Sequence, residues 1–579
     1  MISRLFFSCL IFLFVPFATL AGTARVSESS DGFESNDISG HSATSDDGNF
    51  VVFVSQADNL VANDRNGHRD VFLHDRSTGK TSRINLAPDG TEANGIFTTP
   101  DISGDGHYVV YSSSADNLVP GDANRESDIF VFDRRTGGTE RISLGLNGNE
   151  ANDFSHSPGI SSDGRFVTFA SLANNLVPGD SNDEPDVFLH DRSTGKTTRV
   201  NVASDGTEAN VGVVLYWGLW NVVPVSDDGR FVAFNSPASN LVPGDTNGEE
   251  DVFLRDLLNK ETTRISVTSD GGEADGSNLL TGMSDDGRLV LFMSFAPNLV
   301  QQNDARPSLF IYDRTSGKTQ PVEFSSNGSI SAASGWGSCI SGDGGFVAFA
   351  APVNARVPWS DSENHNLFVL DLTTGRTLRV TMAHDGGDTD ARVWACDLSY
   401  DGRYIAFDSN ADNLVAEDRN GETDAFITDN PMFFQINPGL NGSWFNPATN
   451  GQGFFIDVLP TSGLLFMSWN TFDVERPDES IEAQLGDPGH RWLVGQGPYS
   501  GNQAILNIYS SNGGVFDAAE PRPEFDQDGE MLVEFTSCRS GTVTYEIPSV
   551  DQSRVIPIQR VALDNATTCE SQAGQIQTE

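Results

Sequence analysis

Residues 226–256 read SDDGRFVAFNSPASNLVPGDTNGEEDVFLRD, and similar stretches occur seven times along the chain. The Asp-Gly pair near the start of each copy begins at positions 47, 105, 163, 228, 286, 343 and 401. The spacings are therefore 58, 58, 65, 58, 57 and 58 residues. A nearly constant period of this size is typical of repeat architectures, in which each copy forms one structural unit.

Each copy contains short strand patterns and no helical signal. In the quoted copy, residues 231–234 and 252–254 are apolar runs bounded by Asp, Asn, Gly and Pro, as expected for strands joined by tight turns. The first run is apolar at every position, which is typical of a strand covered on both faces. A strand before Asp-Gly and another after the Thr-Gly turn give four strands per copy. Seven such sheets around an axis predict an all-β fold, a β-propeller.

The two ends of the repeat array complement each other. Six copies continue into a turn and a fourth strand, as in residues 75–84, whereas the seventh stops at Asp429-Asn430-Pro431. Residues 23–36 match the pattern of residues 81–94. We therefore predict a seven-bladed propeller closed by the N-terminal strand. An open array would need atypical caps at both ends instead.

The stretch Asp-Gly-Arg-Phe-Val-Ala-Phe at residues 228–234 resembles the core of the WD40-like (PD40) repeats of TolB-type propellers. The resemblance covers about residues 23–430. It implies a bacterial extracytoplasmic propeller that serves as a binding or scaffold unit, and it implies no particular ligand.

The chain divides into four predicted segments. Residues 1–21 have one basic residue, Arg4, followed by an apolar run and small residues, which is typical of a secretory signal peptide cleaved after Ala21. A membrane anchor is the alternative, but the apolar core is short for a span. We expect the propeller in residues 22–431, a linker in 432–438 and a second domain in 439–579. The mature protein is expected to be secreted or periplasmic, monomeric and without a membrane span.

The second domain is rich in strand patterns separated by Gly and Asn turns, which predicts a small antiparallel β sandwich or barrel. Residues 442–454, GSWFNPATNGQGF, and residues 490–493, HRWL, resemble an uncharacterised module at the C-termini of secreted bacterial proteins. This resemblance implies no activity. Trp444 and Trp492 are expected in the core of the domain rather than in a ligand site.

Four cysteines remain after the signal peptide, an even number for an oxidising compartment. Cys339 and Cys396 precede the Asp-Gly pairs of neighbouring copies, so they should lie on adjacent innermost strands. Cys538 and Cys569 share the second domain. We predict disulfides between residues 339 and 396 and between residues 538 and 569. Free buried thiols are the alternative.

The formal net charge is −46, from 81 acidic and 35 basic residues. This charge argues against a nucleic-acid partner, whose phosphates require Lys and Arg. It favours cations or basic partners, or it serves solubility alone.

Two families of acidic loops are predicted to share one face of the ring. The first family, NLVPGDxNGxxD, places carboxylate, amide and carboxylate groups at i, i+2 and i+6, which are the hard oxygen donors that Ca²⁺ prefers. The alternative is that these side chains cap their own turns, and the pattern lacks the terminal Glu of an EF-hand loop. The predicted metal ligands are Asp64, Asn66, Asp70, Asp122, Asn124, Asp128, Asp180, Asn182, Asp186, Asp245, Asn247, Asp251, Asp418, Asn420 and Asp424. The second family, DGxEAN, contributes Glu34, Glu92, Glu150, Glu208, Glu273 and Asp388.

The repeat is least regular in blades four to six. The long period before blade four adds an insertion with three aromatic residues, and blades five and six lose the acidic loop motif. Aromatic loop residues suit binding of a peptide or a sugar. The alternative is that they plug the channel mouth or pack against the second domain. The predicted partner-binding residues are Tyr216, Trp217, Trp220, Arg306, Trp336, Arg356, Trp359 and His365.

The sequence contains no convincing catalytic set. Gly179-Asp180-Ser181 resembles a hydrolase block, but the equivalent residues in the preceding copy are Gly121-Asp122-Ala123. No Gly-x-Ser-x-Gly elbow and no zinc-binding pattern occurs. We therefore predict a non-enzymatic binding or scaffold propeller that recognises a protein, peptide or glycan on its acidic loop face. The alternatives are a carbohydrate- or peptide-processing enzyme with carboxylates in the propeller mouth, and a purely architectural propeller stiffened by calcium.

Overall fold

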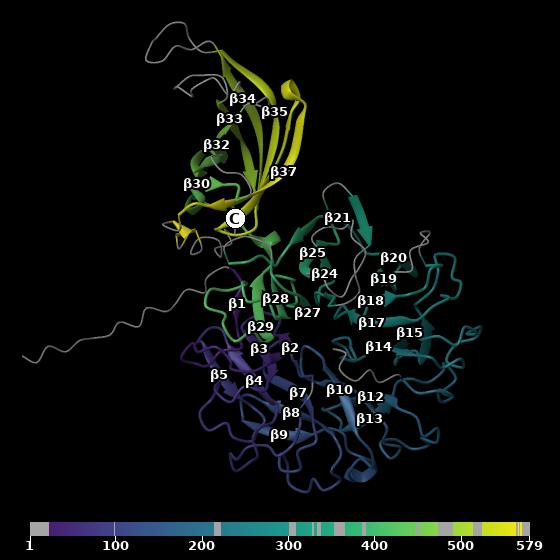
Figure 1. The fold of residues 1–579 in the computed structure, drawn as a ribbon. Coiled ribbons are helices and arrows are strands. Elements are labelled where there is room, and N and C mark those ends of the chain that lie inside the picture. The colour runs from purple at the N-terminus through teal and green to yellow at the C-terminus, as the bar shows by residue number, and fades with distance from the viewer. Residues whose placement is uncertain are drawn as a thin grey trace, which may run out of the picture.

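The computed structural model describes residues 22–97, 99–213, 222–299, 308–326, 329–332, 337–352, 365–384, 389–447, 452–472, 490–512, 524–562, 565–566 and 568–569. These residues form an all-β protein, a seven-bladed propeller followed by a closed antiparallel barrel of eight strands (Figure 1). None of the helices among them is long and apolar enough to cross a membrane.

Each of the first three blades is a four-stranded antiparallel sheet. Blade one contains β2 (Ser39–Thr44), β3 (Phe50–Ser55), β4 (Asp70–Asp75) and β5 (Lys80–Arg83). Blade two contains β6 (Asp101–Ile102), β7 (Tyr108–Ser113), β8 (Asp128–Asp133) and β9 (Gly138–Arg141), followed by the short helix η1 (Leu146–Gly148). Blade three contains β10 (Ser155–Ile160), β11 (Phe166–Ser171), β12 (Asp186–Asp191) and β13 (Lys196–Arg199).

The remaining blades follow the same order with two departures. Blade four contains β14 (Phe231–Ser236), β15 (Asp251–Asp256) and β16 (Glu261–Arg264). Blade five contains β17 (Asn278–Met283), β18 (Leu289–Ser294), β19 (Ser308–Asp313) and β20 (Lys318–Pro321), followed by a hairpin of β21 (Glu323–Ser326) and β22 (Ser329–Ala332). Blade six contains β23 (Cys339–Ile340), β24 (Phe346–Pro352), β25 (His365–Asp371) and β26 (Thr377–Arg379). Blade seven contains β27 (Val393–Leu398), β28 (Tyr404–Ser409), β29 (Asp424–Asp429) and β1 (Ala24–Arg25).

Blade four departs from the predicted four strands. Among its described residues, the innermost position contributes only an isolated bridge between Val225 and Val232. Pro224 precedes this bridge, and proline has no N–H to donate to a ladder. The hairpin β21–β22 was not expected from the repeat, because it lies in a linker between two copies.

The second and third strands of every blade carry the core. Their apolar side chains face both neighbouring blades, as the unbroken apolar runs predicted. An aromatic pair joins these two strands in each of the seven blades, for example Phe234 and Phe253 with ring centroids 5.6 Å apart. Such a pair adds about 0.5–1.5 kcal/mol beyond the burial of its surface. The repeat therefore encodes its own core in each blade.

The ring is closed by β1, as predicted. This strand pairs antiparallel with β29, with Ala24 opposite Ile427 and Arg25 opposite Phe426. The N–H of Val26 continues the ladder by donating to the carbonyl of Ala425 at 2.8 Å. Blade seven is thus built from both ends of the propeller segment.

The second domain is a barrel rather than a sandwich, since β30 pairs with both β31 and β37. Two short helices, η2 (Pro431–Phe433) and η3 (Pro438–Leu440), lead into it. Its other elements are β30 (Gly442–Phe445), β31 (Gly453–Leu459), η4 (Pro460–Ser462), β32 (Leu464–Phe472), β33 (His490–Ser500), β34 (Gln503–Asn512), β35 (Glu524–Phe535), β36 (Ser540–Ile547), η5 (Pro548–Val550) and β37 (Gln552–Arg560). Trp444 lies in the barrel core, 1% exposed, as expected. The side chain of Trp492 lies outside the described residues.

Direct contacts join the barrel to blade six of the propeller. Arg376, in the turn before β26, forms an ion pair with Glu534 at 2.7 Å and donates to Asn502 at 3.0 Å. The rings of Phe346 and Phe433 lie 5.4 Å apart. The barrel therefore docks at the edge of the propeller that carries the Asp-Gly and Thr-Gly turns.

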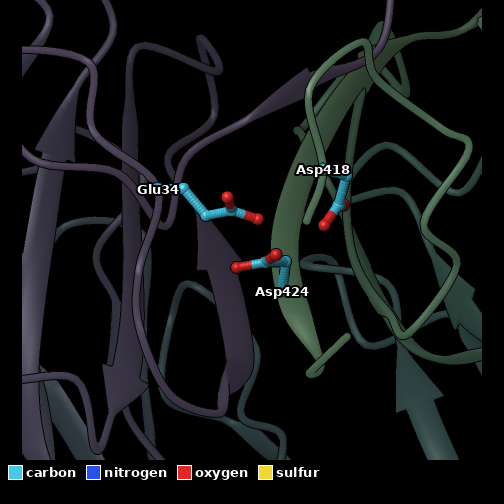
Figure 2. Close-up of side chains that lie close together, drawn as sticks. All are labelled: Glu34, Asp418 and Asp424. Atoms are coloured by element: carbon cyan, nitrogen blue, oxygen red, sulfur yellow. The ribbon is translucent and has the colours of Figure 1, made fainter. Parts of the chain in front are cut away.

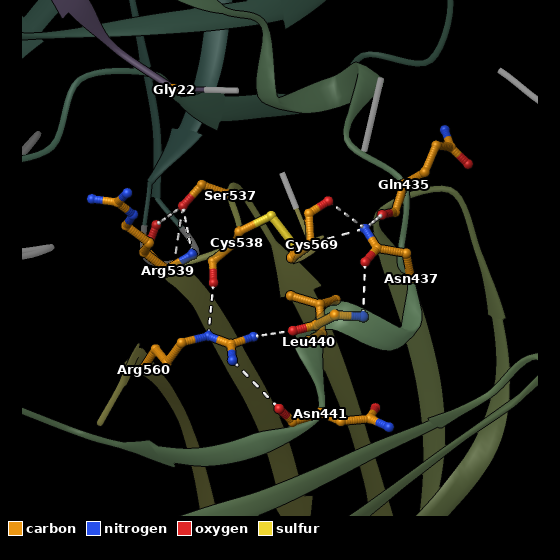
Figure 3. Close-up of a disulfide and its surroundings, with 12 residues drawn as sticks. Gly22, Gln435, Asn437, Leu440, Asn441, Ser537, Cys538, Arg539, Arg560 and Cys569 are labelled. Carbon is orange, nitrogen blue, oxygen red and sulfur yellow. Dashed lines mark hydrogen bonds between the residues drawn. A yellow bond between two sulfur atoms is a disulfide. The ribbon is translucent and has the colours of Figure 1, made fainter. Parts of the chain in front are cut away.

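Both predicted disulfides are present. Cys339 and Cys396 join the innermost strands of blades six and seven. Cys538 and Cys569 fasten the C-terminal segment to the barrel (Figure 3). Beside this second bridge, the Arg560 guanidinium donates to the carbonyls of Cys538 at 3.0 Å and Gly439 at 2.6 Å.

Deleting residues 22–37 removes the closing strand together with Arg25, which lies between the buried carboxylates of Asp418 and Asp424. Removing one partner of a buried ion pair costs about 3–5 kcal/mol, so we expect a much lower melting temperature by differential scanning calorimetry. The control Phe33→Ser changes an exposed side chain of the same segment and should melt like the wild type. An unchanged melting temperature in the deletion would mean that strand closure contributes no stability.

Candidate functional site

Five blades hold an arginine inside a cluster of three carboxylates at the loop face. In blade one, Nη1 of Arg83 lies 2.9 Å from Asp64, 2.9 Å from Asp70 and 3.0 Å from Glu92. The arginine comes from the last strand of the blade, and the acids come from the two loop families predicted to share this face. The other clusters are Arg141 with Asp122, Asp128 and Glu150; Arg199 with Asp180, Asp186 and Glu208; Arg264 with Asp245, Asp251 and Glu273; and Arg25 with Asp418, Asp424 and Glu34.

The cluster of Arg25 straddles the seam where the ring closes. Figure 2 shows the carboxylates of Glu34, Asp418 and Asp424 turned toward one another, with Glu34 from the N-terminal segment and the two aspartates from blade seven. Asp424 also accepts hydrogen bonds from the hydroxyls of Ser27 and Ser35 at 2.5 and 2.7 Å. This cluster therefore ties together residues almost four hundred positions apart in sequence.

Burial and mutual repulsion set the protonation of these acids. Burial, followed by the neighbouring carboxylate, raises the pKa of Asp64, Asp122, Asp180 and Asp245 to about 6. The third acid behaves differently, since the N–H of Thr246 lowers the pKa of Glu273 to about 2. One arginine thus balances a glutamate and two aspartates, and the first aspartate of each of these motifs gains a proton as the pH falls through about 6.

Calcium does not fit these clusters while the arginine is in place. The acids of two clusters do converge, with oxygens of Asp245, Asp251 and Glu273 within 4.8 Å of one another. However, the guanidinium already lies among those oxygens, and Ca²⁺ needs about 6–8 oxygen ligands. The predicted amide ligands face away as well: Oδ1 of Asn66 accepts the N–H of His68 at 2.9 Å, and the equivalent asparagines cap their own turns in the same way. Calcium binding at these loops stays a prediction.

The arginine is the residue that the sequence analysis missed. Its signal was present, because an arginine follows the second aspartate of the motif by 13 residues in all four clusters that lie within one copy. Blade five has Pro321 at this position, and it has also lost the acidic loop motif. In blade six Arg379 remains but binds the amide oxygen of Asn366 at 2.7 Å.

Most of the predicted partner-binding residues cannot be placed. Seven of them lie outside the described residues: Tyr216, Trp217, Trp220, Arg306, Trp336, Arg356 and Trp359. His365 is described, and it begins β25 with only 2% of its surface exposed. Its side chain is therefore part of the interior of blade six.

A second group of carboxylates surrounds the central channel, where a cavity of about 220 Å³ is lined by residues from all seven blades. At the Asp-Gly end, the residue before each Asp-Gly pair forms a ring, which we call the channel ring. Its members are Asp46, Gly104, Ser162, Asp227, Asp285, Gly342 and Tyr400. Three aspartates therefore meet at this end of the channel.

Glycines in the neighbouring blades make room for two of these aspartates. The N–H of Asp46 donates to the carbonyl of Gly104 at 2.9 Å, and the N–H of Asp285 donates to that of Gly342 at 2.9 Å. A Cβ on Gly104 would lie 2.0 Å from Oδ2 of Asp46, and one on Gly342 would lie 2.2 Å from Oδ2 of Asp285. Each carboxylate therefore occupies the space that a side chain at the facing glycine would fill. Asp285 also reaches across the ring to accept the Ser162 hydroxyl at 3.3 Å.

Two further aspartates lie deeper in the channel and connect adjacent blades. Oδ2 of Asp101 accepts the N–H of Ile160 at 3.0 Å, and Oδ2 of Asp397 accepts the N–H of Thr44 at 2.8 Å. These bonds satisfy backbone donors that the innermost strands leave unpaired. Asp101 and Asp397 thus have a structural role in holding adjacent blades together.

The channel carboxyls have a strong tendency to hold protons. Burial, then repulsion by Asp227, raises the pKa of Asp46 to about 6 and that of Asp285 to about 7. Burial alone is the main cause for Asp101 and Asp397, whose pKa values rise to about 7. No Lys or Arg is among the described residues that line this cavity. His41 is the one described lining residue that could carry a positive charge, and burial, with repulsion by Arg69, lowers its pKa to about 4.

No protein-family model matches the sequence, and no curated protein matches it. Among solved structures, a protein from Agrobacterium tumefaciens described as TolB is 15% identical over 49% of this chain and 80% of its own, with a TM-score of 0.31. A prolyl endopeptidase is 13% identical over 75% of this chain and 55% of its own, with a TM-score of 0.40. The tricorn protease is 10% identical over 90% of this chain and 58% of its own, with a TM-score of 0.21. This chain thus spans just over half the length of both proteases, and these values support no statement about activity.

Replacing Arg264 by Met leaves Asp245, Asp251 and Glu273 without their cation. We expect a loss of up to about 3–5 kcal/mol in unfolding free energy near neutral pH, and a smaller loss near pH 5, where Asp245 gains a proton. Urea titration at both pH values measures the difference. If calcium can occupy the emptied cluster, millimolar Ca²⁺ should restore more stability to this variant than to the wild type.

The control for this experiment lies in the same blade. Arg230 pairs with Asp256 at 2.7 Å but is one-third exposed, and exposed pairs contribute about 0–1 kcal/mol. Arg230→Met should therefore unfold almost like the wild type. Equal losses in the two variants would contradict a special role for the clusters.

From the raised pKa values in the channel, we predict that the free energy of unfolding increases as the pH falls from about 8 to about 5. Asp46 and Asp285 bind protons more tightly in the folded state than in the unfolded chain, where the pKa of Asp is about 3.9. Their contribution is therefore complete below the unfolded pKa and is lost as the pH rises through about 6–7. Asp285→Asn should flatten this dependence and add about 1–2 kcal/mol near pH 8, measured by thermal melts across the range. The exposed variant Asp31→Asn should keep the full dependence, and a pH profile unaffected by Asp285→Asn would exclude this cause.

Proposed function

We propose that the protein is an extracytoplasmic, non-enzymatic binding propeller whose central channel accepts a cationic group of a protein or peptide partner. The observation that carries the proposal is the channel itself: Asp46, Asp101, Asp285 and Asp397 line one cavity, Asp227 acts on Asp46 electrostatically, and no described lining residue is Lys or Arg. The two disulfides and the predicted signal peptide support an oxidising compartment.

The electrostatics favour the channel over the acidic loop face. At the loop face, five arginines already lie among the carboxylates at ion-pair distance. In the channel, repulsion by Asp227 adds to burial in raising the pKa values of Asp46 and Asp285, so these two carboxyls tend to hold protons. A Lys or Arg side chain from a partner could replace those protons and gain a charge-assisted hydrogen bond with a carboxylate.

The dimensions of the cavity suit a side chain. Its volume of about 220 Å³ is smaller than the ~300–1,000 Å³ of pockets that hold drug-sized ligands. The channel ring is also accessible, since Tyr400 is 45% exposed. We therefore infer that a basic segment of a partner inserts one or two side chains while the rest of the partner contacts the surrounding turns.

The test is isothermal titration calorimetry of the mature protein with a lysine-containing oligopeptide and with a glutamate-containing peptide of the same length. We expect binding of the basic peptide only, with an affinity that increases from about pH 5.5 to about pH 8 as the channel carboxyls lose their protons. The double variant Asp46→Asn/Asp285→Asn should abolish binding. The control Asp31→Asn/Asp551→Asn changes the net charge equally at exposed positions outside the channel and should bind normally. Equal effects of the two double variants would show that binding reflects overall charge only.

The second candidate is a carbohydrate- or peptide-processing enzyme. It is favoured by one observation, namely that Asp285, with a pKa near 7, lies close to Asp227 and Asp46 in a cavity. A protonated carboxyl beside an ionisable one is an arrangement that supports general acid catalysis. Turnover of chromogenic glycosides or fluorogenic peptides that disappears in Asp285→Asn would favour this candidate over simple binding.

A further inference from the structure

The third strand of every blade ends in an aspartate, and seven copies of this residue allow a comparison within one chain. They are Asp75, Asp133, Asp191, Asp256, Asp313, Asp371 and Asp429. In six blades the carboxylate accepts the N–H of the residue two positions later, at 2.7–3.0 Å. Each of these six aspartates therefore caps the turn that leads to the fourth strand.

Asp429 is the exception, because the chain leaves the propeller after it. The residue two positions later is Pro431, which has no N–H to donate. The donor comes instead from the other end of the propeller, where the nitrogen of Gly22 lies 3.0 Å from Oδ2 of Asp429. The pairing of β1 with β29 sets this contact, and it also brings the hydroxyls of Thr23 and Thr428 to 3.1 Å.

Asp429 is suited to a cationic partner. Burial raises its pKa, and this effect is opposed at longer range by Arg76 and Arg403. Arg76 is engaged elsewhere, because it donates to the carbonyl of Gly48 at 2.7 Å and lies over the ring of Tyr404. Within the part of the chain that the structure describes, no side-chain ion pair includes Asp429. A hydrogen bond from a neutral amide would leave the buried carboxylate without a counter-charge in direct contact.

We propose that cleavage after Ala21, which the sequence predicts, releases an amino group on Gly22 that forms an ion pair with Asp429. Hydrolysis by a signal-peptidase-type endoprotease adds one water across the bond, leaving a carboxylate on Ala21 and an α-ammonium group on Gly22. The nitrogen that donates to Asp429 thereby gains a full positive charge and two further N–H donors. Removal of the leader and stabilisation of the closing strand then become one event.

Gly22 lies at the junction between the propeller and the second domain. Gly22 and Asp429 line a cavity of about 340 Å³ between blade seven and the barrel, together with Ser537 and Arg539. In Figure 3, Ser537 and Arg539 flank Cys538 of the disulfide, and Gly22 is labelled above them on the propeller side. The other charged or titratable groups around this cavity are His384 and Arg403. The nitrogen of Gly22 therefore belongs to a residue that lines this junction.

The test compares two forms of the full mature chain, one that begins at Gly22 and one that carries two extra residues before Gly22. Mass spectrometry of the secreted protein should identify Gly22 as the first residue. Near pH 6.5 the form that begins at Gly22 should melt several degrees higher than the extended form. An amine paired with an ionised carboxylate has a raised pKa. This difference should therefore be complete from above the pKa of Asp429, which burial raises, up to about pH 8, the usual α-amino value, and should vanish at higher pH.

Matched variants separate the ion pair from a general effect of the extension. Asp429→Asn should abolish the difference between the two forms, whereas Asp371→Asn, which removes the equivalent carboxylate in blade six, should lower both melting temperatures and keep the difference. A difference that survives Asp429→Asn, no difference at all, or a first residue other than Gly22 would overturn the proposal.

A second measurement compares the same two forms and needs no amino-acid substitution. An amine-reactive ester at neutral pH should label the α-amine of Gly22 much more slowly than the α-amine of the extended form. Equal labelling rates would also overturn the proposal.

Discussion

The pairing of β1 with β29 is the interaction on which the rest of the propeller depends. Each blade has its own core, but a blade is held in place only by its two neighbours, and blade seven is complete only when the N-terminal strand joins it. The channel ring exists for the same reason, because Asp46 belongs to blade one and Asp227 and Asp285 belong to blades four and five. Without closure these carboxylates would not meet.

Closure also brings opposite charges together in a chain whose formal net charge is −46. The repeat places one arginine in the last strand of a blade, where it lies among acids from two loops. The cluster of blade seven is assembled across the seam, with Arg25 and Glu34 from one end of the propeller and Asp418 and Asp424 from the other. Strand pairing and charge compensation therefore stabilise the same contact between the N-terminal segment and blade seven. Asp429 lies at the end of this contact that is nearer the barrel.

The loop face and the channel show two solutions to the same electrostatic problem. At the loop face the chain supplies its own cations, so the acids serve the structure. In the channel the acids from different blades converge without a described Lys or Arg among the lining residues, and burial raises their pKa values instead. This contrast moves the expected binding site from the loops to the axis of the ring, because charge that the protein leaves unbalanced is available to a partner.

The period of the Asp-Gly pairs, the unbroken apolar runs and the incomplete seventh copy were sufficient to predict seven blades, ring closure and both disulfides from the sequence. Those features are local or strictly periodic, so the structure inferred for one copy applies to the other copies. The channel ring could not be predicted in the same way, because its members vary from Asp to Gly, Ser and Tyr, and their meaning depends on which blades face each other across the axis. Likewise, the carboxylates of the loop motif were visible in the sequence, but only the tertiary structure showed that an arginine lies among them. The sequence alone determined the repeating unit, because the residues that form its strands, core and turns all lie within one copy. The tertiary structure decided which charges meet, because these charges belong to residues that only closure of the ring brings together.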